Sequence, residues 1–233
     1  PSVATLTPSE VVQAILLAPV DLLWNGGIGT YVKAAGQSNA DVGDKANDAV
    51  RVNGRDLRCR VVGEGGNLGL TQAGRIEAAR CGVQLNTDAI DNSAGVDCSD
   101  HEVNIKILLD TVVADGDLTV KQRNELLGAM TDDVSDHVLL DNYLQNQVLG
   151  YARAQAPALL PVHQRLMQSL EERGMLDRAL EVLPSDHEIG ELLAEGKGLS
   201  SPELCVLLSY AKIALTTDLS TSGLAQEKWF DSV

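Results

Sequence analysis

The stretch RVVGEGGNLGLTQ, residues 60–72, has the residue types of a loop that holds phosphate groups. A strand-like run precedes it and a helix-like run, residues 71–80, follows it, as in a dinucleotide-binding turn. Glycines suit such a turn because the backbone can approach a pyrophosphate closely and donate its N–H groups. An acid, Asp88, follows roughly 20 residues on, as the fingerprint requires. The spacing departs from G-x-G-x-x-G, because the third glycine comes one place late; the three are Gly63, Gly65 and Gly69.

Two further turns rich in glycine or asparagine follow runs that we expect to be strands. NGGIG, residues 25–29, comes after the expected strand 20–24, and DNSAGV, residues 91–96, comes after the expected strand 83–90. In an open α/β sheet the carboxyl ends of parallel strands face one ligand crevice. The three loops together therefore predict a ligand site. For any single loop, the alternative that glycines only permit a tight turn stays open.

The histidines and cysteines form no local metal-binding motif. The four histidines lie at least 24 positions apart, and none of the four cysteines belongs to a C-x-x-C motif. We therefore expect no metal site, and reduced cysteines, as is typical of a cytoplasmic protein. Asp115 and Asp117 are interpreted as part of a helix cap, and Tyr210 with Lys212 as a core tyrosine near a solvated lysine.

The composition is that of a soluble globular protein, and it excludes some partners. Of 233 residues, 44% are hydrophobic but only 3% aromatic, so aliphatic side chains must build the core. A net charge of −15 repels phosphate backbones and anionic lipids, so we expect no nucleic-acid and no membrane partner. The apolar run 14–24 contains Pro19 and Asp21 and is too short to span a bilayer. The chain begins with Pro1, which indicates a fragment of a longer polypeptide.

The elements that would position these loops alternate between strands and helices in the first half of the chain. The segment Thr7-Pro8-Ser9-Glu10 is a capping box with proline at the first helical position. We expect a helix from Pro8, strands over 20–24, 56–62 and 83–90, a helix over 71–81, and a helix that Ser99 or Asp100 caps. This alternation is typical of βαβ units with a parallel sheet.

After Asp115 the strand patterns stop and helical patterns continue to the C-terminus. A second capping box at Ser200-Ser201-Pro202-Glu203 starts the last of these helices. The sequence therefore predicts an α/β fold in two domains. Residues 1–114 are expected to be the C-terminal half of a Rossmann-like, doubly wound parallel dinucleotide-binding domain, and residues 115–233 an all-helical C-terminal domain.

Long stretches of the chain resemble the C-terminal region of the very large bacterial NAD-specific glutamate dehydrogenases. The resemblance covers nearly the whole chain and is far more specific than any short motif. It is carried by PVDLLWNGGIGTYVKA (19–34), VVGEGGNLGLTQAGRIEAARCGVQLNTDAIDNSAGVDCSDHEVNIKILL (61–109) and GLSSPELCVLLSYAKIAL (198–215).

The resemblance gives the glycine-rich stretch a different interpretation. In glutamate dehydrogenases the phosphate-binding loop lies earlier, and a later strand ends in a segment like E-G-A-N, which residues 64–67 resemble. The opening stretch is then a later strand-to-helix turn and not the phosphate fingerprint. Residues 92–102 resemble the family motif N-A-G-G-V-x-x-S-x-x-E, with Ser93 and Ala94 in place of the usual alanine and glycine.

Several site roles are implied by the resemblance. Asn92 would lie beside the nicotinamide carboxamide or the substrate, where an amide can both donate and accept. Ser99 would donate to the distal carboxylate of glutamate, although a helix N-cap is the alternative for its hydroxyl. The remaining cofactor-binding residues would be Asn25, Gly26, Glu64, Gly65 and Asn67.

The function implied is oxidative deamination of L-glutamate to 2-oxoglutarate and ammonia, with hydride transfer to NAD. The family's catalytic lysine and aspartate belong to a preceding substrate domain, so we expect no catalytic residue in this chain and no activity of the chain alone. The parent polypeptide is expected to form a homo-oligomer. Two alternatives stay open: a stand-alone nucleotide-binding protein that uses the three glycines, and a non-catalytic helical interaction or regulatory module formed by residues 116–233.

Overall fold

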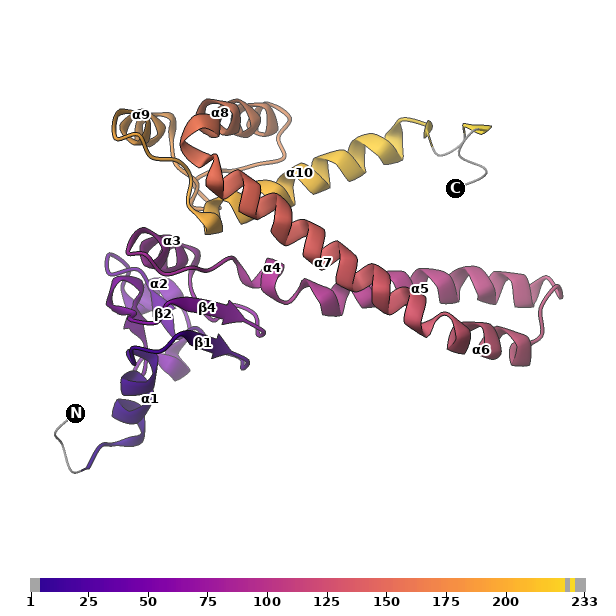
Figure 1. Cartoon of the computed structure of the whole chain (residues 1–233), viewed down its shortest axis with the longest axis horizontal. Coiled ribbons are helices and arrows are strands. Elements are labelled where there is room, and N and C mark those ends of the chain that lie inside the picture. Colours follow the sequence, from indigo (N-terminus) through magenta and orange to yellow (C-terminus); the bar gives the residue numbers. More distant parts are fainter. Residues whose placement is uncertain (1–4, 225–226, 229–233) are drawn as a thin grey trace.

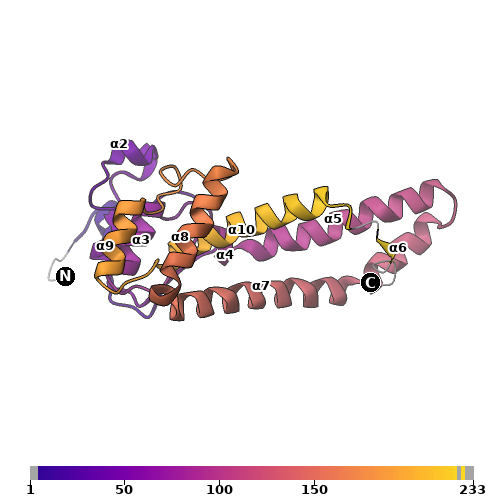
Figure 2. The same ribbon diagram turned by 90° about the horizontal axis from the view of Figure 1, so that it is seen from above.

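The computed structural model describes residues 5–224 and 227–228, which form an α/β part followed by a helical part (Figure 1). The α/β part contains all the described strands and lies at one end of the molecule. From α4 (Asp88–Asp91) onward, each described element is a helix. Seen from above, α5, α6 and α7 extend away from the α/β part as an arm (Figure 2).

The strands pair in two small parallel sheets. β1 (Leu22–Asn25) pairs with β4 (Val61–Glu64), and β2 (Val32–Lys33) pairs with β3 (Val52–Asn53). The register of the first pair sets Asn25 opposite Glu64. The carboxyl ends of β1 and β4 therefore meet at one edge, as we expected for parallel strands.

Side-chain caps fix the starts of the helices in the α/β part. The Thr7 hydroxyl accepts from the Glu10 N–H, and the Glu10 carboxylate accepts from the Thr7 N–H, which confirms the predicted start of α1 (Pro8–Leu16). The Thr71 hydroxyl accepts from the Gly74 N–H and starts α3 (Gln72–Arg80), also as predicted. Between β2 and β4 lie the short α2 (Asn39–Val42) and two 3₁₀ turns, Lys45–Asn47 and Gly54–Asp56.

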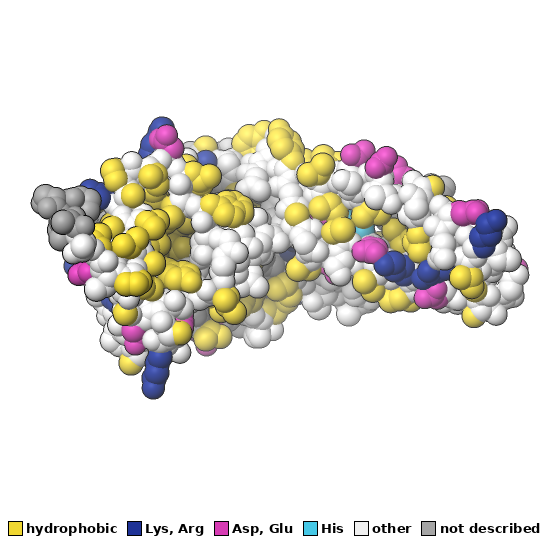
Figure 3. All heavy atoms as spheres, turned by 90° about the horizontal axis from the view of Figure 1, so that it is seen from below, with side chains coloured by type: hydrophobic (Ala, Val, Ile, Leu, Met, Phe, Trp, Pro, Cys, Tyr) yellow, Lys and Arg dark blue, Asp and Glu magenta, His cyan; other side chains and the backbone are white. Residues whose placement is uncertain are grey.

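The α/β part has its own aliphatic core beneath α3. Its fully buried members come from strands, loops and helix alike, and include Val32, Val62, Leu70 and Ala78. Gly54 lets the backbone approach α3 closely, because a Cβ there would lie 2.3 Å from the Gly74 carbonyl oxygen. Exposed apolar side chains also gather on this part of the molecule (Figure 3). Among the exposed ones are Leu22 and Trp24 of β1.

The helical part is built from a compact end and the arm. Its helices are α5 (Ser93–Ala114), α6 (Val120–Ala129), α7 (Thr131–Ala154), α8 (Ala156–Glu172), α9 (Asp186–Ala194) and α10 (Ser201–Thr221). The compact end has a second core, in which Leu160, Met167 and Ile189 are fully buried. By contrast, α5 and α6 have no buried residue. The arm is therefore held mainly by the packing of α5 along α7.

Two predicted elements are wrong in type or position. The expected strand 83–90 contributes only an isolated bridge between Gln84 and Val61, because α4 already begins at Asp88. The helix expected from Ser99 or Asp100 begins at Ser93, with Asn92 at the N-cap position. The predicted start of α10 after Ser200 is confirmed.

The α/β class with a helical C-terminal part is confirmed, whereas the Rossmann-like sheet stays a prediction, since the described strands form only small sheets. The first core ends at Leu85 and the second begins at Ile90. The predicted domain boundary at residue 115 stays a prediction. None of the helices in the described part of the chain combines the length and hydropathy of a membrane-spanning segment.

Candidate functional site

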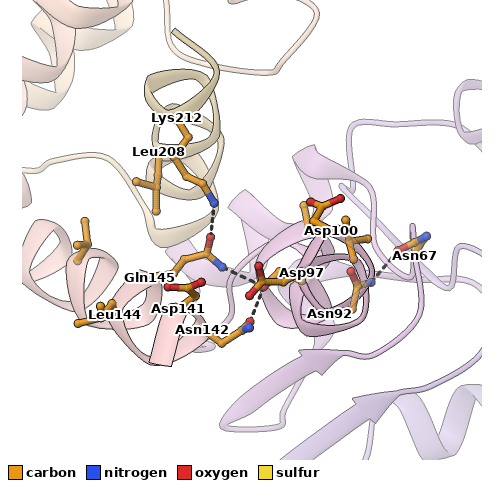
Figure 4. Close-up of a pocket in the computed structure, with 14 residues that line it drawn as sticks. Asn67, Asn92, Asp97, Asp100, Asp141, Asn142, Leu144, Gln145, Leu208 and Lys212 are labelled. Carbon is orange, nitrogen blue, oxygen red and sulfur yellow. Dashed lines mark hydrogen bonds between the residues drawn. The ribbon is translucent and has the colours of Figure 1, made fainter. Parts of the chain in front are cut away.

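A cavity of about 810 Å³ lies where the turn after β4 meets the helical part (Figure 4). Its walls come from α5, α7 and α10 and from the loop that follows β4. The polar side chains that line it include Asn67, Asn92, Asp97, Asp100, Asp141 and Lys212. The cavity thus contains two of the residues that the sequence assigned to a site, together with charged residues that it did not.

Asn67 and Asn92 are brought together at the cavity wall. The Asn92 Nδ2 donates to the Asn67 Oδ1 at 2.6 Å. Leu68, next in the loop, has the left-handed backbone conformation (φ 58°), which is strained for a leucine. Its N–H donates to the Asp88 Oδ2 at 2.7 Å, and its carbonyl accepts from the Thr30 hydroxyl at 2.7 Å. The fold therefore holds Asn67 in place through a constrained loop.

A path of hydrogen bonds joins three helices across the cavity. Lys212 Nζ on α10 donates to Gln145 Oε1 at 2.9 Å (Figure 4). Gln145 Nε2 on α7 donates in turn to the Ser93 Oγ at 3.1 Å. The Ser93 hydroxyl also lies 2.5 Å from Asn142 Oδ1. Ser93 is a position at which the chain departs from the family motif. Its hydroxyl links α5 to α7 through hydrogen bonds with Asn142 and Gln145, which an alanine side chain could not form.

The charges on the cavity wall are unbalanced. Asp97, Asp100 and Asp141 face one lysine, Lys212. Lys212 can bind a carboxylate of a ligand, and the amides can bind a group that needs both a donor and an acceptor. Because the wall carries more carboxylates than basic groups, it can also bind a cation.

Beneath this wall lies a buried ionic group centred on Glu64 and Arg75. The Arg75 Nε and Nη2 donate to the two Glu64 carboxylate oxygens at 2.7 and 2.9 Å, and Arg75 Nη2 lies 3.1 Å from Asp88 Oδ1. Glu64 is 1% exposed and Arg75 4%. The Glu64 N–H donates to Asp91 Oδ2 at 3.0 Å. The group therefore joins β4, α3 and α4 beneath the cavity.

Burial sets the protonation tendencies of this group. It raises the pKa of Glu64 above its ordinary value, and the Arg75 guanidinium opposes that rise. Burial likewise raises the pKa of Asp91, opposed by the Glu64 N–H. The Glu64 side chain is thus occupied by Arg75 and by the Leu70 N–H, which donates to its Oε1 at 3.1 Å.

The glycine-rich turn is occupied by the protein itself. The N–H groups of Gly65 and Gly66 both donate to the Asn25 carbonyl, at 2.9 and 3.0 Å. A Cβ on Gly63 or on Gly65 would lie 2.6 Å from the Trp24 ring. These glycines therefore let β1 pack against the β4 turn, and their N–H groups are not arranged to hold a phosphate.

Asn25 and Gly26 lie where β1 ends, and neither lines the large cavity. Asn25 lines a smaller cavity of about 330 Å³, whose walls are mostly apolar and include Leu16 and Leu70. Its Nδ2 is buried and has no hydrogen-bond partner within the described part of the chain. The structure thus divides the predicted cofactor residues between two neighbouring places.

Ser99 is exposed on α5 and does not line the large cavity. Because α5 begins at Ser93, the alternative that Ser99 caps a helix is wrong. Its hydroxyl makes no hydrogen bond that we find among residues 5–224 and 227–228, and it is accessible to a ligand.

Sequence reasoning missed the residues that the fold brings in from the distant helices. Lys212 is exposed, as expected, but nothing within its own helix indicates that it lines a cavity beside Asn92. Its neighbour Tyr210 donates to Glu181 Oε1 at 2.7 Å, and this carboxylate raises the pKa of Tyr210 to about 12. Arg75 could have been found, because a buried glutamate at a strand end needs a cation.

Comparison with known families agrees with these observations. Residues 2–152 match the family described as bacterial NAD-glutamate dehydrogenase, catalytic domain. Residues 196–233 match the family described as glutamate dehydrogenase, C-terminal. The first match contains the β4 turn, Asn92 and α5, and the second contains α10 with Lys212.

Similar proteins occur in several bacteria, each under the name NAD-specific glutamate dehydrogenase. The one from Pseudomonas aeruginosa is 59% identical over 217 residues, 93% of this chain and 13% of its own length. The protein from Halomonas elongata is 57% identical over 95% of this chain, and that from Mycobacterium tuberculosis 51% over 98%. The chain spans 14% of the length of each of these two relatives.

Proposed function

Since the chain belongs to the bacterial NAD-glutamate dehydrogenase family, we propose that it is part of a longer enzyme that deaminates L-glutamate oxidatively with NAD. The products are 2-oxoglutarate and ammonia. NAD supplies the chemistry of the step by accepting the hydride from the α-carbon. The protein has to orient glutamate and exclude competing water.

The observation that carries this proposal is the pair Asn67 and Asn92 on the wall of the large cavity. An amide fits the carboxamide of a nicotinamide, because both groups donate and accept. Asn67 fixes the orientation of Asn92 by accepting from its Nδ2, which leaves the Asn92 carbonyl oxygen to accept from a ligand N–H. The nicotinamide end of the cofactor is thus the end that these residues fit.

The pyrophosphate end of NAD belongs elsewhere in the longer polypeptide. The N–H groups of Gly65 and Gly66 are taken by Asn25, so the β4 turn does not offer a phosphate cradle. This observation also weighs against a stand-alone nucleotide-binding protein. We assign Gly65, Gly26 and Asn25 to shaping the strand edge beside the cofactor.

Glu64 acts as a positioning residue in this account. Its carboxylate is held by Arg75, while its N–H holds Asp91, the residue before Asn92. A shift of Glu64 would therefore be passed to Asn92 through α4. This explains how a fully buried acid can matter for a cofactor that it does not touch.

Lys212 and Ser99 are the groups that suit the carboxylates of glutamate. Lys212 brings a cation to the cavity wall, and Ser99 offers an exposed hydroxyl on α5, outside the residues that line the cavity. The catalytic lysine and aspartate lie in a substrate domain outside this chain, and the chain alone is inactive. The longer enzyme is a cytoplasmic homo-oligomer.

Residues 1–114 are the second half of the dinucleotide-binding domain and residues 115–233 a helical C-terminal domain. The exposed apolar side chains of β1 support an incomplete dinucleotide-binding domain, since Leu22 and Trp24 are 54% and 59% exposed. Further strands of the longer polypeptide would cover them, because large exposed apolar side chains that gather on one surface mark an interface.

The test is glutamate-dependent NADH formation by the longer polypeptide, with Ser99→Ala and a matched control, Ser220→Ala, at an exposed position on α10. Losing one hydrogen bond to a charged group costs about 1.5–3 kcal/mol, so KM for glutamate should rise by about 10- to 150-fold in Ser99→Ala only. The 233-residue chain should form no NADH. A longer polypeptide that is inactive with glutamate and NAD would overturn the proposal, and an unchanged KM in Ser99→Ala would remove Ser99 from the site.

A further inference from the structure

Two helices of the arm bring a histidine and two aspartates together. Asp97 and His101 lie one turn apart on α5, and Asp141 reaches them from α7. One ligand atom from each of the three lies within 4.8 Å of the others. The expectation of no metal site considered only neighbours along the sequence, whereas His101 and Asp141 are joined by folding.

The distances suit a shared ion better than direct hydrogen bonds. His101 Nε2 lies 3.6 Å from Asp97 Oδ1 and 3.5 Å from Asp141 Oδ2, which is longer than an ordinary N–H···O bond. In a tetrahedral zinc site with bonds of about 2.0–2.2 Å, neighbouring ligand atoms lie about 3.3–3.6 Å apart. Both observed distances fall on the edges of such a tetrahedron.

The two aspartates of the cluster lack a basic partner other than His101 in the described part of the chain, and Asp97 is the more enclosed of the two, with its side chain 26% exposed against 54% for Asp141. Among the residues that the structure describes, neither Asp97 nor Asp141 forms a salt bridge with lysine or arginine; each approaches only His101. The Asp97 Oδ2 is buried and has no hydrogen-bond partner there. Such an oxygen is costly to bury unless a proton donor or a cation meets it.

We propose that Asp97, His101 and Asp141 form a zinc-binding site that ties α5 to α7. One imidazole with two carboxylates is a donor set that Zn²⁺ accepts, and its charge neutralises both aspartates. The fourth position of the tetrahedron opens toward the large cavity, which Asp97 and Asp141 line, and takes a water molecule. The His137 ring stacks on His101, with centroids 5.9 Å apart, and holds the imidazole in place.

The location gives the site a structural effect. Because α5 and α6 bury no residue, the arm has little core of its own. An ion that bridges α5 and α7 supplies a fixed cross-link where packing is weak, and binding to the folded state alone stabilises it by mass action. Zinc should therefore rigidify the arm and leave the α/β part unchanged.

The experiment is calorimetric titration of the reduced, metal-free 233-residue chain with Zn²⁺, together with thermal unfolding with and without the ion. We expect one Zn²⁺ per chain and a higher Tm with zinc but not with Mg²⁺, which prefers an octahedral set of oxygen ligands. His101→Ala and Asp141→Asn should each weaken binding by more than about 10-fold, because loss of even an indirect support costs that much in metal sites.

Two control variants distinguish this site from other zinc ligands. Cys98, next to Asp97 in sequence, lines a different hollow, between α5, α6 and α7, and His187 lies on α9. Cys98→Ser and His187→Ala should therefore bind Zn²⁺ as the unchanged chain does. Absence of binding would overturn the proposal, as would loss of binding in either control or full binding by His101→Ala. Co²⁺ in place of Zn²⁺ should show the intense visible absorption of tetrahedral cobalt, whereas an octahedral spectrum would contradict the site.

Discussion

Two groups of carboxylates lie within one molecule and differ in what surrounds them. Around Glu64, Arg75 donates to both oxygens, and the nearby Asp88 and Asp91 accept from backbone N–H groups. Asp97 and Asp141 share one partner, His101, whose Nε2 lies farther from each carboxylate than in an ordinary hydrogen bond. The first group is satisfied by the protein, so its role is architectural. In the second group, the Asp97 Oδ2 is buried without a hydrogen-bond partner among the described residues, which is the condition of a site that awaits a ligand.

The same distinction separates the two polar turns. The β4 turn has the residue types of a phosphate loop, but its N–H groups are used within the fold. The turn that contains Asn92 has a less conspicuous sequence, yet its side chain faces the large cavity. What the polar groups already bind is therefore a better guide to function than the residue types alone.

The largest expected effect is at the satisfied group. Glu64→Ala leaves the Arg75 guanidinium buried without its main partner, and breaking a buried ion pair costs about 3–5 kcal/mol of the free energy of unfolding. Urea unfolding measures this cost. Glu125→Ala, at an exposed pair with Lys121, is the control and should change stability by less than about 0.5 kcal/mol. Equal effects of the two variants would contradict an architectural role for Glu64.

The next effect tests whether the glycines serve packing. Gly63→Ala places a Cβ 2.6 Å from the Trp24 ring and should cost about 1–3 kcal/mol of stability through overpacking. Trp24 is 59% exposed, so Trp24→Ala removes the clash at moderate cost. In a double-mutant cycle by urea unfolding, Trp24→Ala should relieve most of the loss in Gly63→Ala. Strictly additive effects would show that the close approach of Gly63 to Trp24 is not what requires glycine.

A smaller effect is expected at the link between α5 and α7. Ser93→Ala removes the hydroxyl that contacts Asn142 and Gln145, and should cost about 1–2 kcal/mol, as for a partly buried hydrogen-bonded group. Hydrogen exchange of α5 amides should increase, while that of β4 amides should not. Faster exchange in both regions would mean that Ser93 supports the whole fold and not this junction.

Removing a carboxylate from the group of Asp97 and Asp141 should not lower stability, in contrast to Glu64→Ala. Asp97→Asn removes a negative charge that no lysine or arginine balances among the described residues, so without zinc the variant should be at least as stable as the unchanged chain. Thermal unfolding in the presence of a chelator is the measurement. Clear destabilisation would mean that Asp97, like Glu64, stabilises the fold, and would contradict the proposed difference between the two groups of carboxylates.

The smallest effect on stability is expected at the exposed carboxylate of Asp186, and only at acidic pH. Hydrogen bonds from Arg178, and then from Gln164 and Gln168, lower the pKa of Asp186 from 3.8 to about 2. A lowered pKa contributes stability that is present above the unfolded value and is lost as the pH falls from about 3.8 towards 2. Tm measured against pH should therefore fall less steeply in Asp186→Asn than in the unchanged chain over that window. Parallel curves would contradict this linkage.

Local sequence signals predicted much of the fold. The capping segments at Thr7, Thr71 and Ser200 determine helix starts through contacts three residues away, so α1, α3 and α10 could be found. The expected strand 83–90 was wrong, because Asp88 pairs with Arg75 and accepts from the Leu68 N–H, and α4 begins there instead. Tertiary contacts decided the structure at that point.

The site was predictable only in the part that the resemblance covers. Asn67 and Asn92 were named, and the fold brings them together. Lys212, Gln145 and Asp141 come from helices that no periodicity places beside Asn92, since side-chain spacing along one helix says nothing of which helix it will meet. Their contribution follows from the packing of α5, α7 and α10.

The most direct measurement is kcat/KM for glutamate in the longer polypeptide with Asn92→Ala, beside the control Asn124→Ala at an exposed position on α6. The Asn92 side chain makes no capping hydrogen bond to α5, so the variant should keep its fold and lose only the exposed hydrogen bond to Asn67. We predict a loss of kcat/KM of about 10-fold or more in Asn92→Ala and none in the control, because an amide contact to the ligand is worth about 1.5 kcal/mol or more. An unchanged kcat/KM in Asn92→Ala would contradict the assignment of this cavity as the place where glutamate and the nicotinamide meet.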